Sequence, residues 1–333
     1  MKSFTLANPT TIEQAIELLG RRAEPGARGR VQLFAGGQDL LTEMKEHLAE
    51  PDVLVNLKGI GGLAGIELDG SGALAIGALA TIAALEEHEG IRARHRVLAE
   101  AAASIASPQI RSVGTLGGNL CQRPRCWYYR SEHAKCLKKG GSECFSYSGL
   151  NKYNAILGGG PSYIVHPSDL APALVALDAE ATLRGAAGER TVPLEKFFTL
   201  PAEGSVLREN VLAGDEILAR VRVPAPAAGT RSTYLKFKER GSFDFALASV
   251  ALSLVLEGGK VARARVVLGG VAPIPWRAKD AEAALVGKGL DEDAFKAAGE
   301  GAVRGAEPLE HNAYKVPLVK GLVFRALQTL SRA

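Results

Sequence analysis

The apolar residues of this chain recur at two spacings, one typical of helices and one typical of strands. Between residues 12 and 19 the apolar positions follow a helical period. Thr10 or Thr11 is placed to cap this helix, and Glu13 or Gln14 is placed to close a capping box. The same period predicts helices over residues 38–46, 81–88, 97–105, 168–177, 278–286, 291–303 and 314–330.

Alternation of apolar and polar residues, together with short apolar runs, predicts the strands. Residues 66–76 are typical of a hairpin, with Asp69-Gly70 and Gly72 in its turn. In the last third of the chain the strands come first and the helices follow, which predicts a sheet covered by helices on one face. The other predicted strands span residues 31–35, 53–57, 163–166, 181–184, 217–223, 234–238, 248–257 and 261–268.

The composition is that of a globular protein, with 47% hydrophobic and 23% charged residues among 333. This length predicts two or three domains, with candidate boundaries at residues 59–62 and 224–229. The net charge of +4 arises from interspersed charges without a basic tail, so we expect no nucleic-acid partner. The chain shows neither a signal-peptide pattern nor an apolar run of roughly 20 residues, which predicts a cytoplasmic protein outside the membrane. Export on a partner's signal would leave no trace in this sequence.

Two glycine-rich segments are candidates for a ligand site. Gly36-Gly37 separates a predicted strand from a predicted helix, an arrangement that brings backbone N–H groups and a helix dipole to one point and suits a phosphate. A tight turn would explain the same pair. Neither the G-x-G-x-x-G nor the P-loop pattern is present, so a nucleotide site would need a different fold. Because an isolated histidine lacks the partner that positions a base, we expect His88 and His95 on the solvated surface.

All four cysteines, Cys121, Cys126, Cys136 and Cys144, fall within one 24-residue window that follows the second glycine-rich segment, residues 115–119. The neighbouring cations favour thiolates, which iron and zinc require. The spacing lacks the C-x-x-C pairs of structural zinc sites and the regular run of small ferredoxins. An iron-sulfur cluster, another metal, free thiols and a disulfide therefore remain open, although a cytoplasmic location favours metal over disulfide. The cations are Arg123, Arg125, Lys135, Lys138 and Lys139.

Six motifs in register carry a resemblance that spans nearly the whole chain. With them the sequence resembles the FAD-binding (medium) subunits of the molybdenum hydroxylases, the family of xanthine dehydrogenase, carbon monoxide dehydrogenase and aldehyde oxidoreductase. The motifs are A-G-G-Q-D-L-L at 35–41, G-A-L-A-T at 77–81, I-R-S-V-G-T-L-G-G-N-L at 110–120, H-P-S-D at 166–169, D-E-I-L at 215–218 and L-G-G-V-A-P at 268–273.

The resemblance implies an α+β fold with a two-lobed FAD-binding domain of the vanillyl-alcohol oxidase type, followed by a C-terminal α+β domain of the CO dehydrogenase flavoprotein type. The lobes would span residues 1–60 and 61–224, and the last domain residues 225–333. Both glycine-rich segments would bring N–H groups to the FAD pyrophosphate, and a lysine near the ring would favour its reduced, anionic form. The implied FAD-contacting residues are Leu33, Phe34, Ala35, Gly36, Gly37, Gln38, Asp39, Leu40, Ile105, Thr115, Gly117, Gly118, Asn119, Asp169, Leu218 and Lys236.

An insertion of about forty residues, at about 121–162, resembles one in 4-hydroxybenzoyl-CoA reductase and in periplasmic aldehyde oxidoreductases, whose flavin subunits carry an additional 4Fe-4S cluster. The matching stretches are R-C-W-Y-Y at 125–129 and K-C-L-K-K-G-G-S-E-C at 135–144. The resemblance implies Cys126, Cys136 and Cys144 as cluster ligands. Such relatives have a further cysteine near the positions of Tyr153 or Ser162, and Cys121 is assigned here as the fourth ligand.

The resemblance implies an oxidoreductase subunit that relays electrons and needs no catalytic side chain of its own. Its partners would be a large molybdopterin-binding subunit, a small subunit with two 2Fe-2S clusters, and an external carrier such as NAD or ferredoxin. Two other classes of function remain open. One is a self-sufficient FAD oxidase of the vanillyl-alcohol type, and the other is a non-catalytic scaffold that binds zinc.

Overall fold

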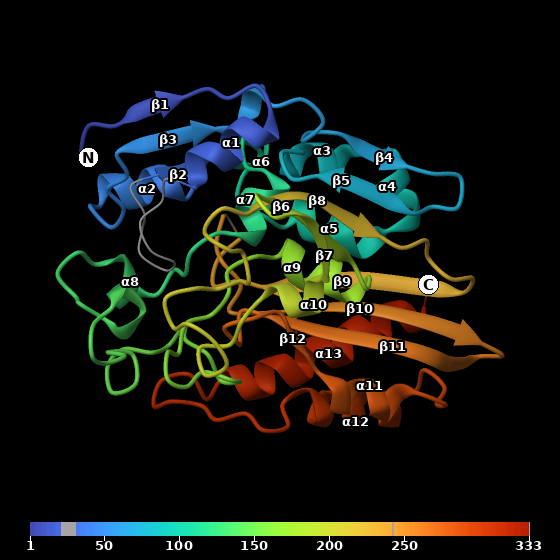
Figure 1. Ribbon diagram of the computed structural model, residues 1–333. Coiled ribbons are helices and arrows are strands. Elements are labelled where there is room, and N and C mark those ends of the chain that lie inside the picture. Colours follow the sequence, from blue (N-terminus) through green and yellow to red (C-terminus); the bar gives the residue numbers. More distant parts are fainter. Residues whose placement is uncertain (21–30, 242, 333) are drawn as a thin grey trace.

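A computed structural model describes residues 1–20, 31–241 and 243–332 of the chain. The N-terminal part forms a small parallel sheet in the order β1-β3-β2, seen at the upper left of Figure 1. The capping box is confirmed at the first helix, where Thr11 accepts from the backbone N–H of Gln14. The elements are β1 (Thr5–Ala7), α1 (Ile12–Leu19), β2 (Val31–Phe34), α2 (Leu40–Lys45) and β3 (Val53–Asn56).

A second, antiparallel sheet follows in the order β4-β5-β8-β6-β7. The predicted hairpin is confirmed as its first two strands, and the Asp69 carboxylate accepts the N–H groups of Ser71 and Ala73 in the turn. The strands are β4 (Ile66–Leu68), β5 (Leu74–Gly77), β6 (Glu180–Gly185), β7 (Gly188–Pro193) and β8 (Ile217–Val223). The helices are α3 (Ile82–Glu87), α4 (Glu89–Arg94), α5 (Arg96–Ala103), α6 (Pro108–Arg111), α7 (Leu116–Leu120), α9 (Leu170–Ala176) and α10 (Leu194–Phe197).

The third sheet, in the order β12-β11-β10-β9, is buried on both faces, so the prediction of helices on one face was incomplete. Helices α11, α12 and α13 cover one face, whereas α5 and α9 of the preceding region cover the other (Figure 1). Neighbours on β10 show this: Ala251 packs with Leu98 and Leu174, while Val250 packs with Val323. The elements are β9 (Thr230–Phe237), β10 (Ala248–Glu257), β11 (Lys260–Gly269), β12 (Trp276–Arg277), α11 (Lys279–Leu285), α12 (Glu292–Ala302) and α13 (Lys315–Ser331).

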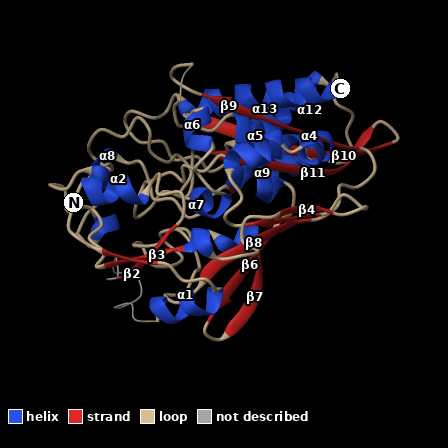
Figure 2. Ribbon diagram, turned by 90° about the horizontal axis from the view of Figure 1, so that it is seen from above, coloured by secondary structure: helices blue, strands red, loops and turns tan. Residues whose placement is uncertain are grey.

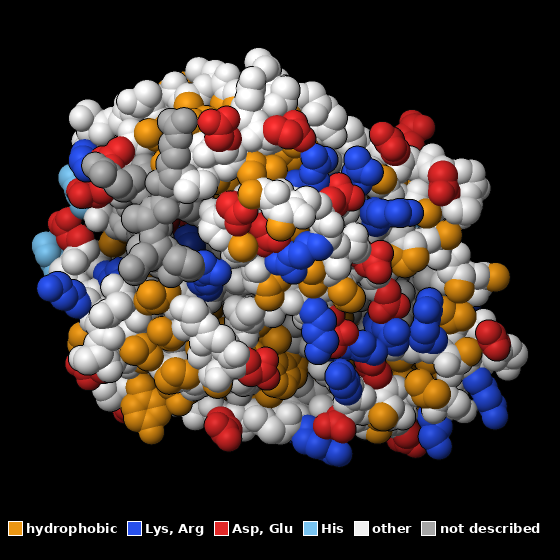
Figure 3. Space-filling view, in the orientation of Figure 1, with side chains coloured by type: hydrophobic (Ala, Val, Ile, Leu, Met, Phe, Trp, Pro, Cys, Tyr) orange, Lys and Arg blue, Asp and Glu red, His pale blue; other side chains and the backbone are white. Residues whose placement is uncertain are grey.

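The cysteine segment, residues 121–162, is mostly loop (Figure 2), with two short helical turns, α8 (Trp127–Arg130) and a 3-10 turn at Leu137–Lys139. Its outer surface exposes large apolar side chains, and hydrophobic groups gather at the lower left of the face in Figure 3. Trp127 is 53% exposed and Tyr147 is 63% exposed. Other apolar side chains of the segment are buried, and Ile156 and Leu157 belong to the core of the third sheet.

Two local predictions were wrong. Residues 163–166 are not a strand, because their backbone bonds to loops: Ala155 N–H donates to the Tyr163 carbonyl, and His166 N–H donates to the Ala272 carbonyl. His95 is buried rather than solvated, with Nε2 lying 2.7 Å from the Gly72 carbonyl oxygen. Within the described ranges, no helix is both long and apolar enough to cross a membrane.

Candidate functional site

A cavity of about 1240 Å³ opens between the first sheet, α7, and the end of β9. Its walls contain both glycine-rich segments, together with the polar pair Asp169 and Lys236. Fifteen of the sixteen residues predicted to contact FAD line it. Phe34 does not: its ring packs beside Met44 and carries the Lys58 ammonium 4.9 Å from its centroid. The fifteen are Leu33, Ala35, Gly36, Gly37, Gln38, Asp39, Leu40, Ile105, Thr115, Gly117, Gly118, Asn119, Asp169, Leu218 and Lys236.

The first glycine-rich segment, residues 35–40, is shaped by contact with the backbone of Val113 and Gly114, just before the second segment. A Cβ atom on Gly36 would lie 2.2 Å from the Val113 carbonyl oxygen and 3.2 Å from the Gly114 Cα atom, so only glycine fits there. Gly37 has a φ of 71°, in the left-handed region that favours glycine. Within the described residues, the N–H groups of Gly36 to Leu40 have no recorded intrachain partner. They are available to an anion at the start of α2.

The second glycine-rich segment forms the short helix α7 and uses its own N–H groups. Leu116 and Gly117 donate to the Ala80 and Ala78 carbonyls, and Gly118 donates to the Thr115 hydroxyl. A Cβ atom on Gly117 would lie 3.0 Å from the Ala78 Cβ atom. The glycines of the second segment therefore permit close backbone packing. The sequence predicted free amides at both glycine-rich segments, and the structure has them at the first segment, residues 36–40.

Asp169 and Lys236 form a buried ion pair at the cavity wall. The Lys236 Nζ atom lies 2.7 Å from Asp169 Oδ2, and both side chains are nearly inaccessible to solvent. Asp169 precedes α9 but does not cap it, because its carboxylate points toward β9. The Tyr234 hydroxyl donates to Asp169 Oδ1 at 2.6 Å. The sequence had assigned Asp169 and Lys236 but missed Tyr234.

Ile105 and Ala106 complete this end of the cavity. Ala106 adopts a φ of 44°, which costs on the order of 1 kcal/mol for a residue with a side chain. The guanidinium of Arg111 donates to the Ile105 carbonyl at 2.8 Å and pairs with Glu86 at 2.6 Å. The bend after α5 is therefore held in one conformation.

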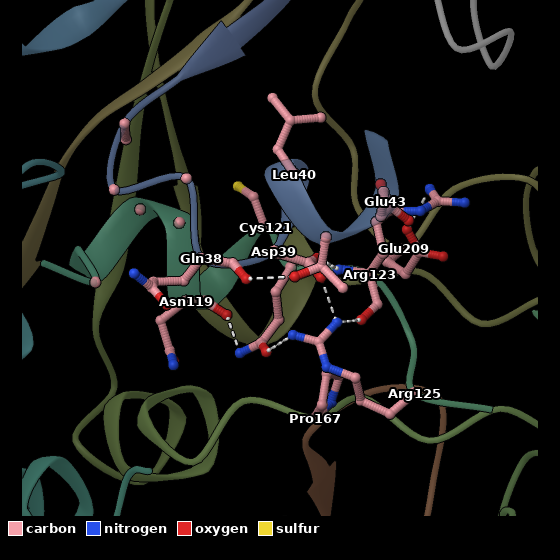
Figure 4. A pocket seen from close by; sticks show the side chains of 18 of the residues that line it. Gln38, Asp39, Leu40, Glu43, Asn119, Cys121, Arg123, Arg125, Pro167 and Glu209 are labelled. Atoms are coloured by element: carbon pink, nitrogen blue, oxygen red, sulfur yellow. Dashed lines mark hydrogen bonds and ion pairs between the residues drawn. The ribbon is translucent and has the colours of Figure 1, made fainter. Parts of the chain in front are cut away.

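Asp39 ties the first glycine-rich segment to the cysteine segment, as Figure 4 shows. Its carboxylate accepts from the backbone N–H of Arg123 at 2.7 Å, from Arg125 at 2.5 Å and from Arg130 at 2.7 Å. Burial acts to raise the pKa of Asp39, but Arg125 and Arg130 outweigh it and hold this pKa below its usual value. The carboxylate is thus ionised at neutral pH.

A second set of polar contacts anchors the cysteine segment from the other side. Glu209 pairs with Arg123 at 2.6 Å and with Lys138 at 2.7 Å, and the Tyr129 hydroxyl donates to Glu43 at 2.8 Å. We had expected Arg123, Arg125 and Lys138 to offset thiolate charge. Their nearest anionic partners are instead the carboxylates of Asp39 and Glu209.

The four cysteines are free thiols and lie in two places. Cys121 follows α7, packs against the core and lines the cavity, and burial raises its pKa to about 12. Cys126, Cys136 and Cys144 lie close enough for their charges to influence one another. Burial raises the pKa of Cys126 to about 11 and also raises that of Cys136, although Lys139 acts to lower the latter.

Neighbouring polar groups reach two of these three thiols. The Asn154 amide nitrogen lies 3.8 Å from Cys126 Sγ, and the Ser146 hydroxyl oxygen lies 3.1 Å from Cys144 Sγ. Among the residues that the structure describes, no group of three or more His, Cys, Asp or Glu side chains is arranged to hold a metal ion. The three thiols are gathered, but they do not form a finished metal site.

Comparison with known proteins identifies the fold and the kind of subunit. Residues 2–226 match the family model described as the FAD binding domain in molybdopterin dehydrogenase, and residues 232–330 match the CO dehydrogenase flavoprotein C-terminal domain. The FAD-binding subunit PaoB of an Escherichia coli aldehyde oxidoreductase is 35% identical, with 96% of each chain covered. The medium chain of Hydrogenophaga pseudoflava carbon monoxide dehydrogenase is 32% identical, covering 97% of this chain and 96% of its own.

Solved structures show the same fold. A structure of carbon monoxide dehydrogenase from Hydrogenophaga pseudoflava, in a form that lacks the Mo-pyranopterin moiety of the molybdenum cofactor, superimposes with a TM-score of 0.76. The two chains are 31% identical, and 98% of this chain and 96% of that one are covered. The predicted α+β fold, an FAD-binding domain followed by a CO dehydrogenase flavoprotein C-terminal domain, is confirmed.

Proposed function

Because this chain belongs to the family of FAD-binding subunits of molybdopterin dehydrogenases, we propose that it carries FAD and relays electrons within a heteromeric molybdenum hydroxylase. The observation that supports this most directly is the cavity, whose walls bring the free amides of residues 36–40 into one space with Asp169 and Lys236. A row of free amides at a helix start fits a diphosphate, and a buried ammonium fits a ring that gains negative charge. The residues present therefore fit FAD.

Within this proposal each part of the chain has a defined task. The backbone of Leu33–Leu40 would hold the pyrophosphate, with Thr115, Gly117, Gly118 and Asn119 forming the wall behind it. Ile105 and Leu218 would pack beside the flavin, and Asp169 would keep Lys236 in place near the ring. When bound, FAD supplies the electron and hydride chemistry, so no side chain here needs to act as a general base.

We further propose the partners that the relatives' names indicate. PaoB is named as a subunit, and the carbon monoxide dehydrogenase relative is named as a medium chain. A large molybdopterin-binding subunit and a small subunit with 2Fe-2S clusters would pass electrons to or from this chain. An external carrier, NAD, ferredoxin or another acceptor, would complete the transfer.

We also propose that Cys126, Cys136 and Cys144 bind an iron-sulfur cluster of the 4Fe-4S type, with Cys121 as the candidate fourth ligand. Three thiols from one segment lie near one another, and Lys139 favours the thiolate of Cys136. Cluster binding would require the segment to rearrange, because the side chains are not yet placed around a metal. Cys121 would have to leave its place at the cavity wall to take part.

The flavin proposal is tested by purifying the full chain with its co-expressed partners and measuring bound FAD. We expect an absorption band near ~450 nm and about one FAD per chain, released on denaturation. A complex that contains every partner but no flavin would contradict the proposal. The two other functions have their own signatures: an FAD oxidase would oxidise an alcohol without partners, and a zinc scaffold would be colourless and contain zinc.

The cluster proposal is tested by iron and sulfide analysis of the same preparation. Cys136→Ser should lose the iron while keeping the FAD, because Cys136 does not line the cavity. Cys121→Ser is the matched variant on the same segment, and loss of iron there would identify the fourth ligand. Iron content that is unchanged in Cys136→Ser would rule out the ligand assignment.

A further inference from the structure

The carboxylate of Asp169 is held by two side chains from the same strand. Tyr234 and Lys236 are two residues apart on β9, so their side chains point to the same face of the sheet. Tyr234 donates to one carboxylate oxygen at 2.6 Å, and Lys236 donates to the other at 2.7 Å. Because each oxygen has its own donor, the carboxylate cannot rotate to meet Lys236 with both oxygens without losing the tyrosine.

Tyr234 itself does not face the cavity. Asp169 and Lys236 line the cavity wall, whereas the ring of Tyr234 packs in the core with side chains of α5 and α9, at 4% exposure. Any effect that Tyr234 has on a ligand must therefore pass through Asp169. The Tyr234 ring packs in the core, and its hydroxyl contacts Asp169, which lines the cavity.

The surroundings keep this hydroxyl a donor. Burial, and the charge of Asp169, raise the pKa of Tyr234 well above its usual value, so the phenol stays protonated. The other polar groups around it are held in place: Glu100 on α5 accepts the Tyr234 N–H at 2.8 Å and pairs with Arg96 at 2.6 Å. The Ser104 carbonyl accepts from Lys236 at 3.2 Å, and the Ser249 hydroxyl of β10 lies close to the phenol.

We infer that Tyr234 is a positioning residue for the flavin site: its hydroxyl fixes the Asp169 carboxylate and, through it, holds the Lys236 ammonium at the cavity wall. This inference rests on the proposed FAD function. A cation held near the ring stabilises the negative charge that reduction adds, and so raises the reduction potential of the flavin. Without the hydroxyl, the carboxylate is free to draw the ammonium back from the wall.

The test is a double-mutant cycle on the intact complex, with the flavin reduction potential measured from pH 6 to pH 9. Tyr234→Phe keeps the ring and removes the donor, so FAD should stay bound, with its affinity changed less than in Lys236→Ala, because the lost hydrogen bond is to Asp169 and not to the ligand. Its potential should fall in the same direction as that of Lys236→Ala, by a smaller amount. Tyr147→Phe, on an exposed tyrosine, is the matched control and should change neither quantity.

The decisive comparison is the effect of Tyr234→Phe in the Lys236→Ala background. If Tyr234 acts through Lys236, removing its hydroxyl there leaves the potential unchanged. An equal shift in both backgrounds, or no shift in the presence of Lys236, would overturn the inference. Failure of the unmutated complex to bind FAD would instead refute the proposed function, so the two failures are distinguishable.

Discussion

Replacing Gly36 by alanine should separate the two glycine-rich segments that form the cavity wall. The added Cβ atom would lie 2.2 Å from the Val113 carbonyl oxygen, where ordinary van der Waals contact begins at 3.4 Å. The difference, 3.4 − 2.2 = 1.2 Å, is the distance by which one backbone must move. The same atom would lie 3.2 Å from the Gly114 Cα atom, so it meets backbone on two sides and no flexible side chain can yield.

The cost of this change follows from overpacking. Forcing an extra carbon atom against fixed backbone typically costs about 1–3 kcal/mol, and we expect Gly36→Ala to lose that much unfolding free energy. The movement also displaces the free amides of residues 36–40, so FAD affinity should fall by at least about tenfold if those amides bind the pyrophosphate. Stability and binding should therefore change together.

The assay compares Gly36→Ala with Gly61→Ala. A Cβ atom on Gly61 meets nothing within 4 Å, and this glycine has no positive φ, so the substitution there should be neutral or slightly stabilising. Unfolding by denaturant gives the free energy, and titration of the FAD-free chain gives the affinity. Equal stability and equal affinity in the two variants would refute the reasoning that Gly36 lies against the Val113–Gly114 backbone.

Two further changes test the contacts that hold the cysteine segment. Asp39→Asn should cost roughly 2 kcal/mol of unfolding free energy by leaving Arg125 without its carboxylate, and Asp280→Asn, at an exposed aspartate, is the control. Because the pKa of Asp39 is lowered in the folded state, its stabilisation is present above pH 3.8 and is lost as the pH falls through the lowered pKa. The variant should therefore lose less stability than the unmutated chain as the pH falls, and an unchanged acid limb would contradict this. Lys315→Met should cost about 3 kcal/mol or more, because the buried Lys315 amino group, whose pKa burial lowers to about 7, donates to the carbonyls of Tyr153, Asn154 and Gly270. Lys320→Met on the same helix, at a half-exposed lysine, should cost little, and equal unfolding free energies for the two variants would rule out that role.

The elements that the sequence predicted well are those whose cause is local. The capping box of α1 needs only Thr11 and Gln14, three residues apart, and the first hairpin needs only the Asp69 turn. The buried strand β10 carries a nearly continuous apolar run, and β11 alternates apolar with charged residues in its first half, patterns that no helix period explains. In each case the residues that determine the element also lie within it.

The elements that failed depend on distant neighbours. Strand β7 was not predicted, because it lies at a sheet edge and its residues are almost all exposed, so it carries no apolar alternation. Residues 163–166 have the apolar character of a strand, but their hydrogen bonds go to loops. His95 looked like a surface residue because its partner, the Gly72 carbonyl, lies 23 residues away.

The candidate site divides along the same line. The glycine-rich segments can be recognised in the sequence, because glycines are needed where backbones approach closely. Of the 16 residues inferred from the resemblance, 15 line one cavity. The side chains that hold the site carry no such mark. Tyr234 lies 65 residues from Asp169, and Arg123 lies 86 residues from Glu209. In the sequence, nothing distinguishes Tyr234 from other strand residues or Arg123 from other charged residues.

The cations beside the cysteines show why charge counting alone misleads. In sequence they stand beside the thiols, but three of them have carboxylate partners, and burial leaves the thiols of Cys126 and Cys136 with raised pKa values. A cluster binds thiolates, so loading iron onto these cysteines would have to release their protons. Iron uptake at this segment should consequently rise with pH, and the segment must move to gather the sulfur atoms.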